Sequence, residues 1–121
     1  MTKTRTKQEI DANTLSAVQS ALGYEFQRPE LLCQSLTHKS AHKTNNERLE
    51  FLGDAVLETI ISLELFSRFG EANEGQLTRA RAQIVKRDSL AQSARRINLG
   101  AYLSLGEGEV RSGGSQRSSI L

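Results

Sequence analysis

The sequence predicts an all-α fold, and three observations predict it. Apolar residues recur at helical spacing between positions 15 and 97, and no stretch alternates as a half-buried strand does. Only 5% of the residues are aromatic and none is Trp, so the core must consist mainly of Leu, Ile, Val and Ala. The length of 121 residues suits a single domain. We therefore expect one helical domain over residues 1–121, with residues 1–10 flexible.

The first two helices are expected to be short. The first follows the cap candidates Asp11 and Asn13 and ends at Gly23, because glycine tolerates the left-handed conformation of a C-cap. Its apolar positions, which share one face, are Leu15, Val18 and Leu22. A second helix begins at Pro29, whose missing N–H is not needed in a first helical turn. Residues 37–45, THKSAHKTN, are polar and aperiodic, and we expect a loop there.

The third helix is the longest expected element. Asn46 can cap it, and the apolar period continues to about Phe69. Two shorter amphipathic helices are predicted at residues 75–85 and 89–97. Beyond them, the glycines of residues 100–114 are expected to break any regular element.

The long helix carries four carboxylates on one face. With Glu50 at zero, Asp54 falls at about 40°, Glu47 at about 60° and Glu58 at about 80° around the helix axis. Like charges at this spacing disfavour a helix, so an offsetting charge is expected. A divalent cation would provide it, since Mg²⁺ needs only a few protein oxygens, and Glu50 with Asp54 could supply half of such a site. The alternative is a solvated face whose charge is paired by Arg48 or a nearby lysine.

Gly53 lies inside the same helix, where a glycine costs roughly 1 kcal/mol relative to alanine. Such a glycine indicates close approach of another backbone. Leu49, Leu52 and Val56 lie on the side of the helix away from the acids. Together with Gly53 they would suit packing against another helix, either in this chain or in a second copy of it.

Residues 45–57, NNERLEFLGDAVL, resemble the signature of the ribonuclease III family. Three further segments resemble family segments in the same order: LTHKSA at 36–41, EGQLTRARAQIVKRDSLA at 74–91 and LGEGEVRSGG at 105–114. The resemblance covers residues 14–121. It implies the helical bundle of the ribonuclease III endonuclease domain.

The resemblance also implies an activity, namely endonucleolytic cleavage of double-stranded RNA, as in the processing of rRNA and mRNA precursors. Metal-assisted hydrolysis of a phosphodiester would leave 5′-phosphate and 3′-hydroxyl ends. The metal would be Mg²⁺, with Mn²⁺ also possible, bound by the catalytic carboxylates of Glu50 and Asp54. Glu47 and Glu74 would have supporting roles near the cleavage groove.

The partners that the resemblance implies are duplex RNA and a second copy of the chain. The homodimer interface would contain the small and apolar residues of the long helix: Leu49, Leu52, Gly53 and Val56. Phosphates of the duplex would be contacted by basic side chains, for which the candidates are Arg79, Arg81, Lys86, Arg87 and Arg117. No double-stranded RNA-binding domain is recognisable in the sequence.

The chain departs from the family pattern at two places. It stops at residues 119–121, Ser-Ile-Leu, after which the family carries an Asp-x-x-Glu element with further metal-binding carboxylates. We therefore expect the last helices of the bundle to be missing and cleavage by this fragment to be impaired. The family commonly has an aromatic, a basic and an acidic residue where this chain has Ser115, Gln116 and Ser118, leaving Arg117 as the only cation there.

Two other functions remain open on the sequence alone. One is a catalytically silent RNA-binding module of the same fold, and the other is a dimerisation module without an RNA role. Cys33, the only cysteine, has no partner for an internal disulfide, and no signal peptide is recognisable, so a cytoplasmic protein is predicted. No apolar run is long enough to cross a bilayer, so no membrane partner is expected.

Overall fold

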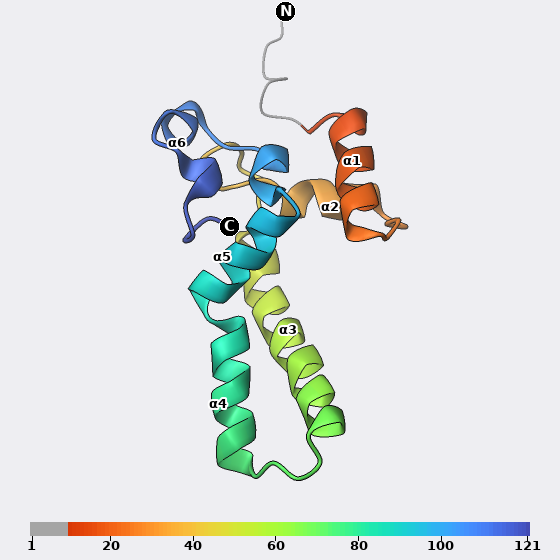
Figure 1. Cartoon of the computed structure of the whole chain (residues 1–121). Coiled ribbons are helices and arrows are strands. Elements are labelled where there is room, and N and C mark those ends of the chain that lie inside the picture. Colours follow the sequence, from red (N-terminus) through yellow and green to blue (C-terminus); the bar gives the residue numbers. More distant parts are fainter. Residues whose placement is uncertain (1–9) are drawn as a thin grey trace, which may run out of the picture.

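A computed structural model describes residues 10–121, and this part of the chain is helical without a strand, as predicted (Figure 1). One isolated parallel bridge joins Thr37 to Ser104. The α-helices are α1 (Ala12–Leu22), α2 (Pro29–Ser35), α3 (Glu47–Arg68), α4 (Glu74–Val85), α5 (Arg87–Arg96) and α6 (Glu107–Arg111). Two 3₁₀ turns are η2 (Leu99–Tyr102) and η3 (Gly114–Gln116). The flexibility expected for residues 1–10 concerns residues outside the described part, except for Ile10, which packs against the core.

Helix α1 begins and ends where the sequence predicts. The Asp11 carboxylate accepts a hydrogen bond from the backbone N–H of Thr14 at 2.8 Å, and this bond holds the pKa of Asp11 below its ordinary value. Gly23 ends the helix with a φ of 68°, in the left-handed region. Pro29 occupies the first turn of α2, as expected.

The bounds of α3 agree with the prediction, and Asn46 occupies the N-cap position as expected, but its side chain makes no capping hydrogen bond. The side chain of Asn46 donates instead to the carbonyl oxygen of Ser35, at 3.2 Å, because the preceding loop folds back onto the end of α2. The amide oxygen of Asn45 accepts a hydrogen bond from the N–H of Glu47, at 3.0 Å. Asn46 thus anchors the preceding loop to α2, and Asn45 satisfies one of the backbone N–H groups that the start of α3 leaves free.

The glycine-rich segment contains more regular structure than predicted. Gly106 precedes α6 and Gly113, with a φ of 79°, follows it, so these glycines end a short helix and do not prevent it. Helix α5 also begins two residues before the predicted start, at Arg87.

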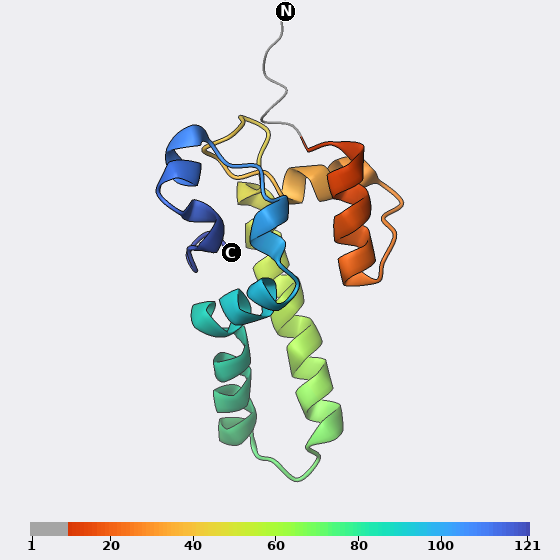
Figure 2. The ribbon, with the colours of Figure 1, turned by 45° about the horizontal axis from the view of Figure 1, so that its top comes forward.

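The helices form a packed head from which a hairpin extends (Figures 1 and 2). In the head, α1, α2 and η2 surround a core of Val18, Leu32 and Leu36. The hairpin consists of α3 and α4, which lie antiparallel and contact each other, and α5 joins α4 to the head. The core is aliphatic, as the low aromatic content predicts. Within residues 10–121, none of the helices combines the length and hydropathy that a membrane crossing requires.

Candidate active site on helix α3

The four acids predicted to share a face all belong to α3, an uninterrupted helix from Glu47 to Arg68. We call these four residues, Glu47, Glu50, Asp54 and Glu58, the acidic stripe. All four residues are exposed. Glu50 and Asp54, in the middle of the stripe, are one turn apart, about 6 Å along the axis. Within residues 10–121, neither carboxylate has an ion pair or a side-chain hydrogen bond. No cation of the described residues therefore lies within ion-pair distance of either carboxylate.

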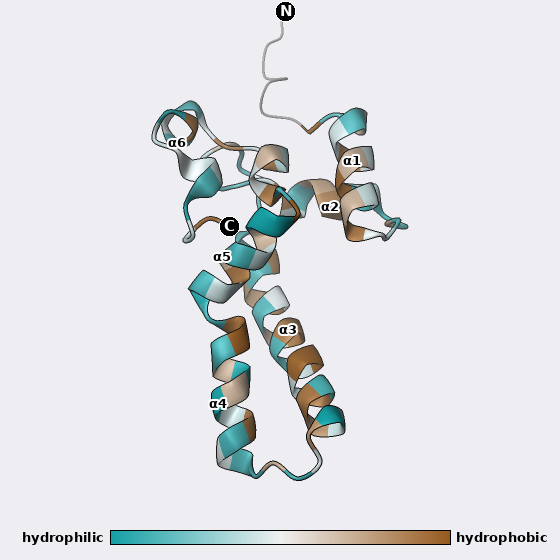
Figure 3. Cartoon of the chain, viewed as in Figure 1, coloured by the Kyte–Doolittle hydropathy of each residue, from teal (hydrophilic) through white to brown (hydrophobic). Residues whose placement is uncertain are grey.

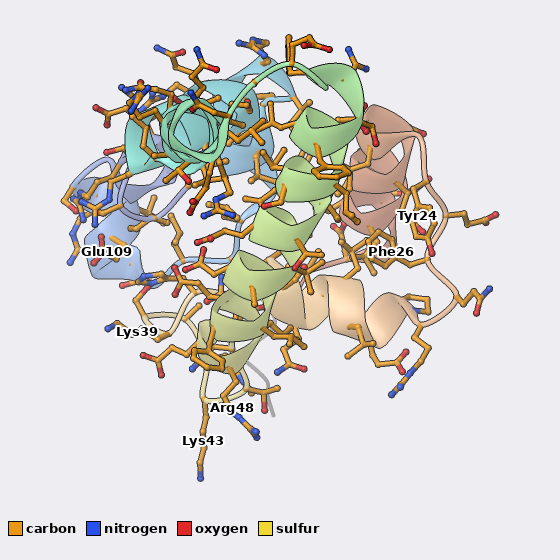
Figure 4. The ribbon with its side chains drawn as sticks, turned by 90° about the horizontal axis from the view of Figure 1, so that it is seen from below. Tyr24, Phe26, Lys39, Lys43, Arg48 and Glu109 are labelled. Atoms are coloured by element: carbon orange, nitrogen blue, oxygen red, sulfur yellow. The ribbon has the colours of Figure 1, made fainter. Side chains whose placement is uncertain are left out.

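The outer acids of the stripe do have cationic partners. Lys39 Nζ lies 3.8 Å from Glu47 Oε2, and Arg81 Nε lies 3.9 Å from Glu58 Oε1. The expectation that a nearby lysine pairs with the stripe is thus correct for Glu47, whereas Arg48 forms no such pair within the described residues. Figure 4 shows Lys39 and Arg48 near the start of α3, with Lys43 pointing away from the chain.

Arg81 comes from α4 and lies in the open groove between α3 and α4. Its Nη1 donates to Ser62 Oγ at 2.9 Å, so the guanidinium is held against α3. The groove has a volume of about 620 Å³, and the residues lining it come from several turns of α3 and from Arg81: Phe51, Asp54, Ala55, Glu58, Thr59, Ser62, Leu63 and Arg81. One cation therefore faces a groove that contains Asp54 and Glu58.

Glu74 lies at the other end of the hairpin. It starts α4, and because α4 runs antiparallel to α3, Glu74 lies close to the C-terminal turns of α3 (Figure 1). There it lines a second groove together with Leu65 and Phe66. Within one chain, the structure does not bring Glu74 to Glu50 and Asp54.

A metal ion would find only part of its ligands in the described residues. No group of three or more His, Cys, Asp or Glu side chains converges within residues 10–121. Glu50 and Asp54 nevertheless fit a hard divalent ion as partial ligands, because they offer exposed, unpaired carboxylate oxygens and such an ion retains several waters. Asp54 also lines the open groove, so its carboxylate is accessible from solvent.

The basic residues predicted to bind RNA fall into two groups. Arg79, Lys86 and Arg87 are exposed and make no ion pair or side-chain hydrogen bond within residues 10–121. Arg81 and Arg117 are engaged. Arg117 Nη1 lies 2.7 Å from Glu109 Oε1, and its Nη2 donates to Ser112 Oγ at 3.0 Å.

Most of the apolar surface of α3 is uncovered. Leu65 is the only buried residue of this helix. Leu52 and Val56 are 58% and 49% exposed, and Figure 3 shows further hydrophobic residues along the helix. A Cβ added at Gly53 would meet nothing within 4 Å. The close backbone neighbour that we expected at Gly53 is therefore not a segment of the described chain. Leu49 is half-buried.

Sequence reasoning foresaw a lysine beside the stripe and named Arg81 as a candidate for RNA, but it missed the contacts of Arg81 with Glu58 and Ser62. Lys39, Arg81 and Ser62 reach the acids or their neighbours only through the fold of the loop and of α4. The signal available in the sequence was Glu58, a fourth acid in the stripe that requires compensation. Its partner lies 23 positions further on, and no local pattern identifies it.

Comparison with known proteins places this geometry in a family. A family model described as ribonuclease-III-like matches residues 28–121. Proteins named ribonuclease 3 from Hahella chejuensis and Pasteurella multocida are 58% and 53% identical to the chain over 107 residues. These alignments cover 88% of the chain but only 47% and 48% of the two relatives. The chain thus spans about half the length of these relatives.

Solved structures give the same match. A structure of the nuclease domain of ribonuclease III from Campylobacter jejuni superposes with a TM-score of 0.84 at 42% identity, covering 88% of this chain and 75% of that one. It is described as showing structural flexibility in a region involved in dimer formation. A 2.2 Å crystal structure of the same domain gives a TM-score of 0.81 at 41% identity, covering 91% and 74% of the two chains.

Proposed function

The chain belongs to the ribonuclease III family, and from this premise we propose that it is the nuclease part of an endoribonuclease that cleaves double-stranded RNA. One observation supports a catalytic role more than any other. Glu50 and Asp54 lie one turn apart on α3 without a partner in the described chain, although the acids on either side of them are paired. Unpaired adjacent carboxylates favour a cation.

The proposed chemistry is hydrolysis of a phosphodiester, which leaves 5′-phosphate and 3′-hydroxyl ends. Mg²⁺, or Mn²⁺ in its place, would activate the attacking water and stabilise the entering and leaving oxygens. Glu50 and Asp54 would bind the ion through their carboxylates, and Glu47 and Glu74 would support the site. Glu74 lies at the far end of the hairpin, so within one chain it would not contact an ion bound by Glu50 and Asp54.

Duplex RNA would be bound through its phosphates. Recognition of an A-form duplex relies on shape and backbone contacts, for which cationic side chains without an internal partner are suited. Arg79, Lys86 and Arg87 meet this condition. Arg81 and Arg117 would first have to leave their present partners.

We further propose that two copies associate through α3, with Leu49, Leu52, Gly53 and Val56 in the interface. The exposed apolar side chains and the open space at Gly53 support this arrangement. The cellular role would be processing of rRNA and mRNA precursors in the cytoplasm, which the family resemblance and the single cysteine favour.

The test is cleavage of duplex RNA with Mg²⁺ by the complete gene product and by its Asp54→Asn variant. Asparagine preserves the shape of the side chain but removes the negative charge. We expect the rate to fall on the order of 100-fold or more, because the rate falls tenfold for every ~1.4 kcal/mol of lost transition-state stabilisation. Glu64→Gln is the matched control, since Glu64 lies on the same helix outside the stripe and pairs with Arg68.

Two results would overturn the proposal. If Asp54→Asn cleaves as fast as the parent, Asp54 is not part of the site. If the parent retains duplex RNA without cutting it, the chain is a silent RNA-binding module of the same fold. Glu64→Gln is expected to cleave at the parental rate.

A further inference from the structure

The acidic stripe offers a divalent ion more than one place to bind. Glu50 and Asp54 are four residues apart, and so are Asp54 and Glu58. The two pairs therefore have the same spacing along α3 and share one member. Glu47 and Glu50 form a third neighbouring pair. Spacing alone does not decide which pair binds the ion, so another feature of the chain must do so.

The feature that distinguishes the pairs is the position of the neighbouring cations. Arg81 lies beside Glu58 and Lys39 lies beside Glu47, at 3.9 and 3.8 Å. A cation next to a carboxylate reduces the charge that a second cation meets there, and it repels that second cation directly. Only the middle pair, Glu50 and Asp54, has no such neighbour in the described chain.

Arg81 is the better anchored of the two cations. Its guanidinium donates to Ser62 Oγ at 2.9 Å, and its side chain is only 38% exposed, whereas that of Lys39 is 65% exposed. The Arg81–Glu58 pair is too exposed and too long to add much to stability. Its charge nevertheless acts within the same groove as Asp54. Arg81 is therefore better suited to influence the charge of the acidic stripe than to stabilise the packing of α4 on α3.

We propose that Arg81 is a positioning residue that confines a divalent ion to Glu50 and Asp54 by neutralising Glu58, with Lys39 limiting the stripe at Glu47. The inference rests on the proposed metal-dependent function. In this role Arg81, which Ser62 holds in place, acts on the acidic side chains of its own chain. It does not bind an RNA phosphate.

The experiment measures Mn²⁺ binding to the full chain by electron paramagnetic resonance of the free ion, for the parent and for Arg81→Gln. Removing the guanidinium makes Asp54 and Glu58 a competing pair and removes a repulsive charge. We expect binding to tighten on the order of fivefold, the size of effect that one unit charge has on a divalent ion nearby in water, or a second ion to bind. Loss of a merely structural contact would weaken binding, which is the opposite change.

Three further variants make the result specific. Arg81→Gln combined with Glu58→Gln removes the competing pair and is expected to return binding toward that of the parent. Arg81→Lys keeps the charge and is expected to bind as the parent does. Arg68→Gln breaks the 2.7 Å pair with Glu64 on the same helix, outside the stripe, and is expected to change nothing.

The outcomes separate the inference from the function on which it rests. If Asp54→Asn weakens Mn²⁺ binding but Arg81→Gln leaves it unchanged or weaker, the role of Arg81 is refuted and the metal site stands. A double variant that stays as tight as Arg81→Gln also refutes it. If the parent does not bind Mn²⁺, or binds it independently of Asp54, the proposed function itself fails.

Discussion

Gly100 is buried where the turn η2 meets the last described segment of the chain. A Cβ built there would overlap the backbone carbonyl oxygen of Ser115, which cannot rotate away as a side chain can. The neighbouring carbonyl of Gln116 accepts a hydrogen bond from Arg95 Nη2 at 2.8 Å. The segment at Ser115 and Gln116 is therefore held both by its contact with Gly100 and by this bond to α5. This close approach is a packing reason for glycine, since the φ of Gly100 is not positive.

We expect Gly100→Ala to lower the free energy of unfolding by about 2 kcal/mol, within the usual range for overpacking a close contact. Urea unfolding followed by circular dichroism measures it. Gly108→Ala is the control, because a Cβ at Gly108 meets nothing within 4 Å and alanine favours a helix. Equal stability of the two variants would contradict the close packing of Gly100 on Ser115.

At the scale of single residues, the sequence predicts the site only as far as helix geometry extends. Glu50 and Asp54 could be placed on one face because an α-helix has a fixed period. The pairing of Glu58 with Arg81 could not be predicted, because it depends on how α4 packs against α3. The pair of Arg117, a candidate for a phosphate contact, with Glu109 was not predicted either, because it depends on how the chain folds back onto α6.

Among the helices, α4 has a feature at its start that no other helix of the described chain shows, a reciprocal capping box. The amide oxygen of Asn73 accepts from the N–H of Gln76 at 2.9 Å, and the side-chain oxygen of Gln76 accepts from the N–H of Asn73 at 3.0 Å. These bonds satisfy two N–H groups that a helix start leaves free. They also fix where α4 begins, and hence the register that brings Arg81 to Ser62.

Asn73→Ala should therefore lower the free energy of unfolding by about 1 kcal/mol, the usual cost of losing an N-cap. Asn73→Asp keeps the acceptor and places a negative charge at the helix start, and it should retain stability. Gln83→Ala, on the same helix, alters a side chain that makes no hydrogen bond in the described chain. Thermal unfolding of the three variants decides the matter, and an Asn73→Ala protein as stable as Gln83→Ala would disprove the role of the cap.

The bounds of whole helices were easier to predict than their caps. Caps at Asp11 and Gly23 follow from local chemistry, and both were correctly expected. The side chain of Asn46 is used elsewhere because the loop before it packs on α2, a tertiary contact. Helix α6 was missed because the glycines of this segment were taken to break the chain, whereas Gly106 and Gly113 flank the helix and Gly108 lies within it.

In the molecule as a whole, the apolar residues of the head are buried in a core, whereas many apolar residues of the hairpin are exposed. The aliphatic core lies among α1, α2 and η2, whereas the main packing partner of α3 in the described chain is α4. The opposite side of α3 exposes the large apolar residues Leu52, Val56 and Ile60, and Leu63, at the edge of the groove, extends this exposed surface. A continuous exposed apolar face of this kind is typical of an interaction surface. A two-fold arrangement would let the same face of each copy cover that of the other.

Val56→Lys should prevent the proposed association, because it places a charge at the centre of the apolar face, where the parent exposes 49% of the residue. Sedimentation equilibrium at micromolar concentrations is expected to give a dimer for the parent and a monomer for the variant. Val110→Lys is the matched control, since Val110 is 61% exposed but belongs to α6. A parent that sediments as a monomer, or a Val56→Lys variant that still dimerises, would exclude this face as the interface.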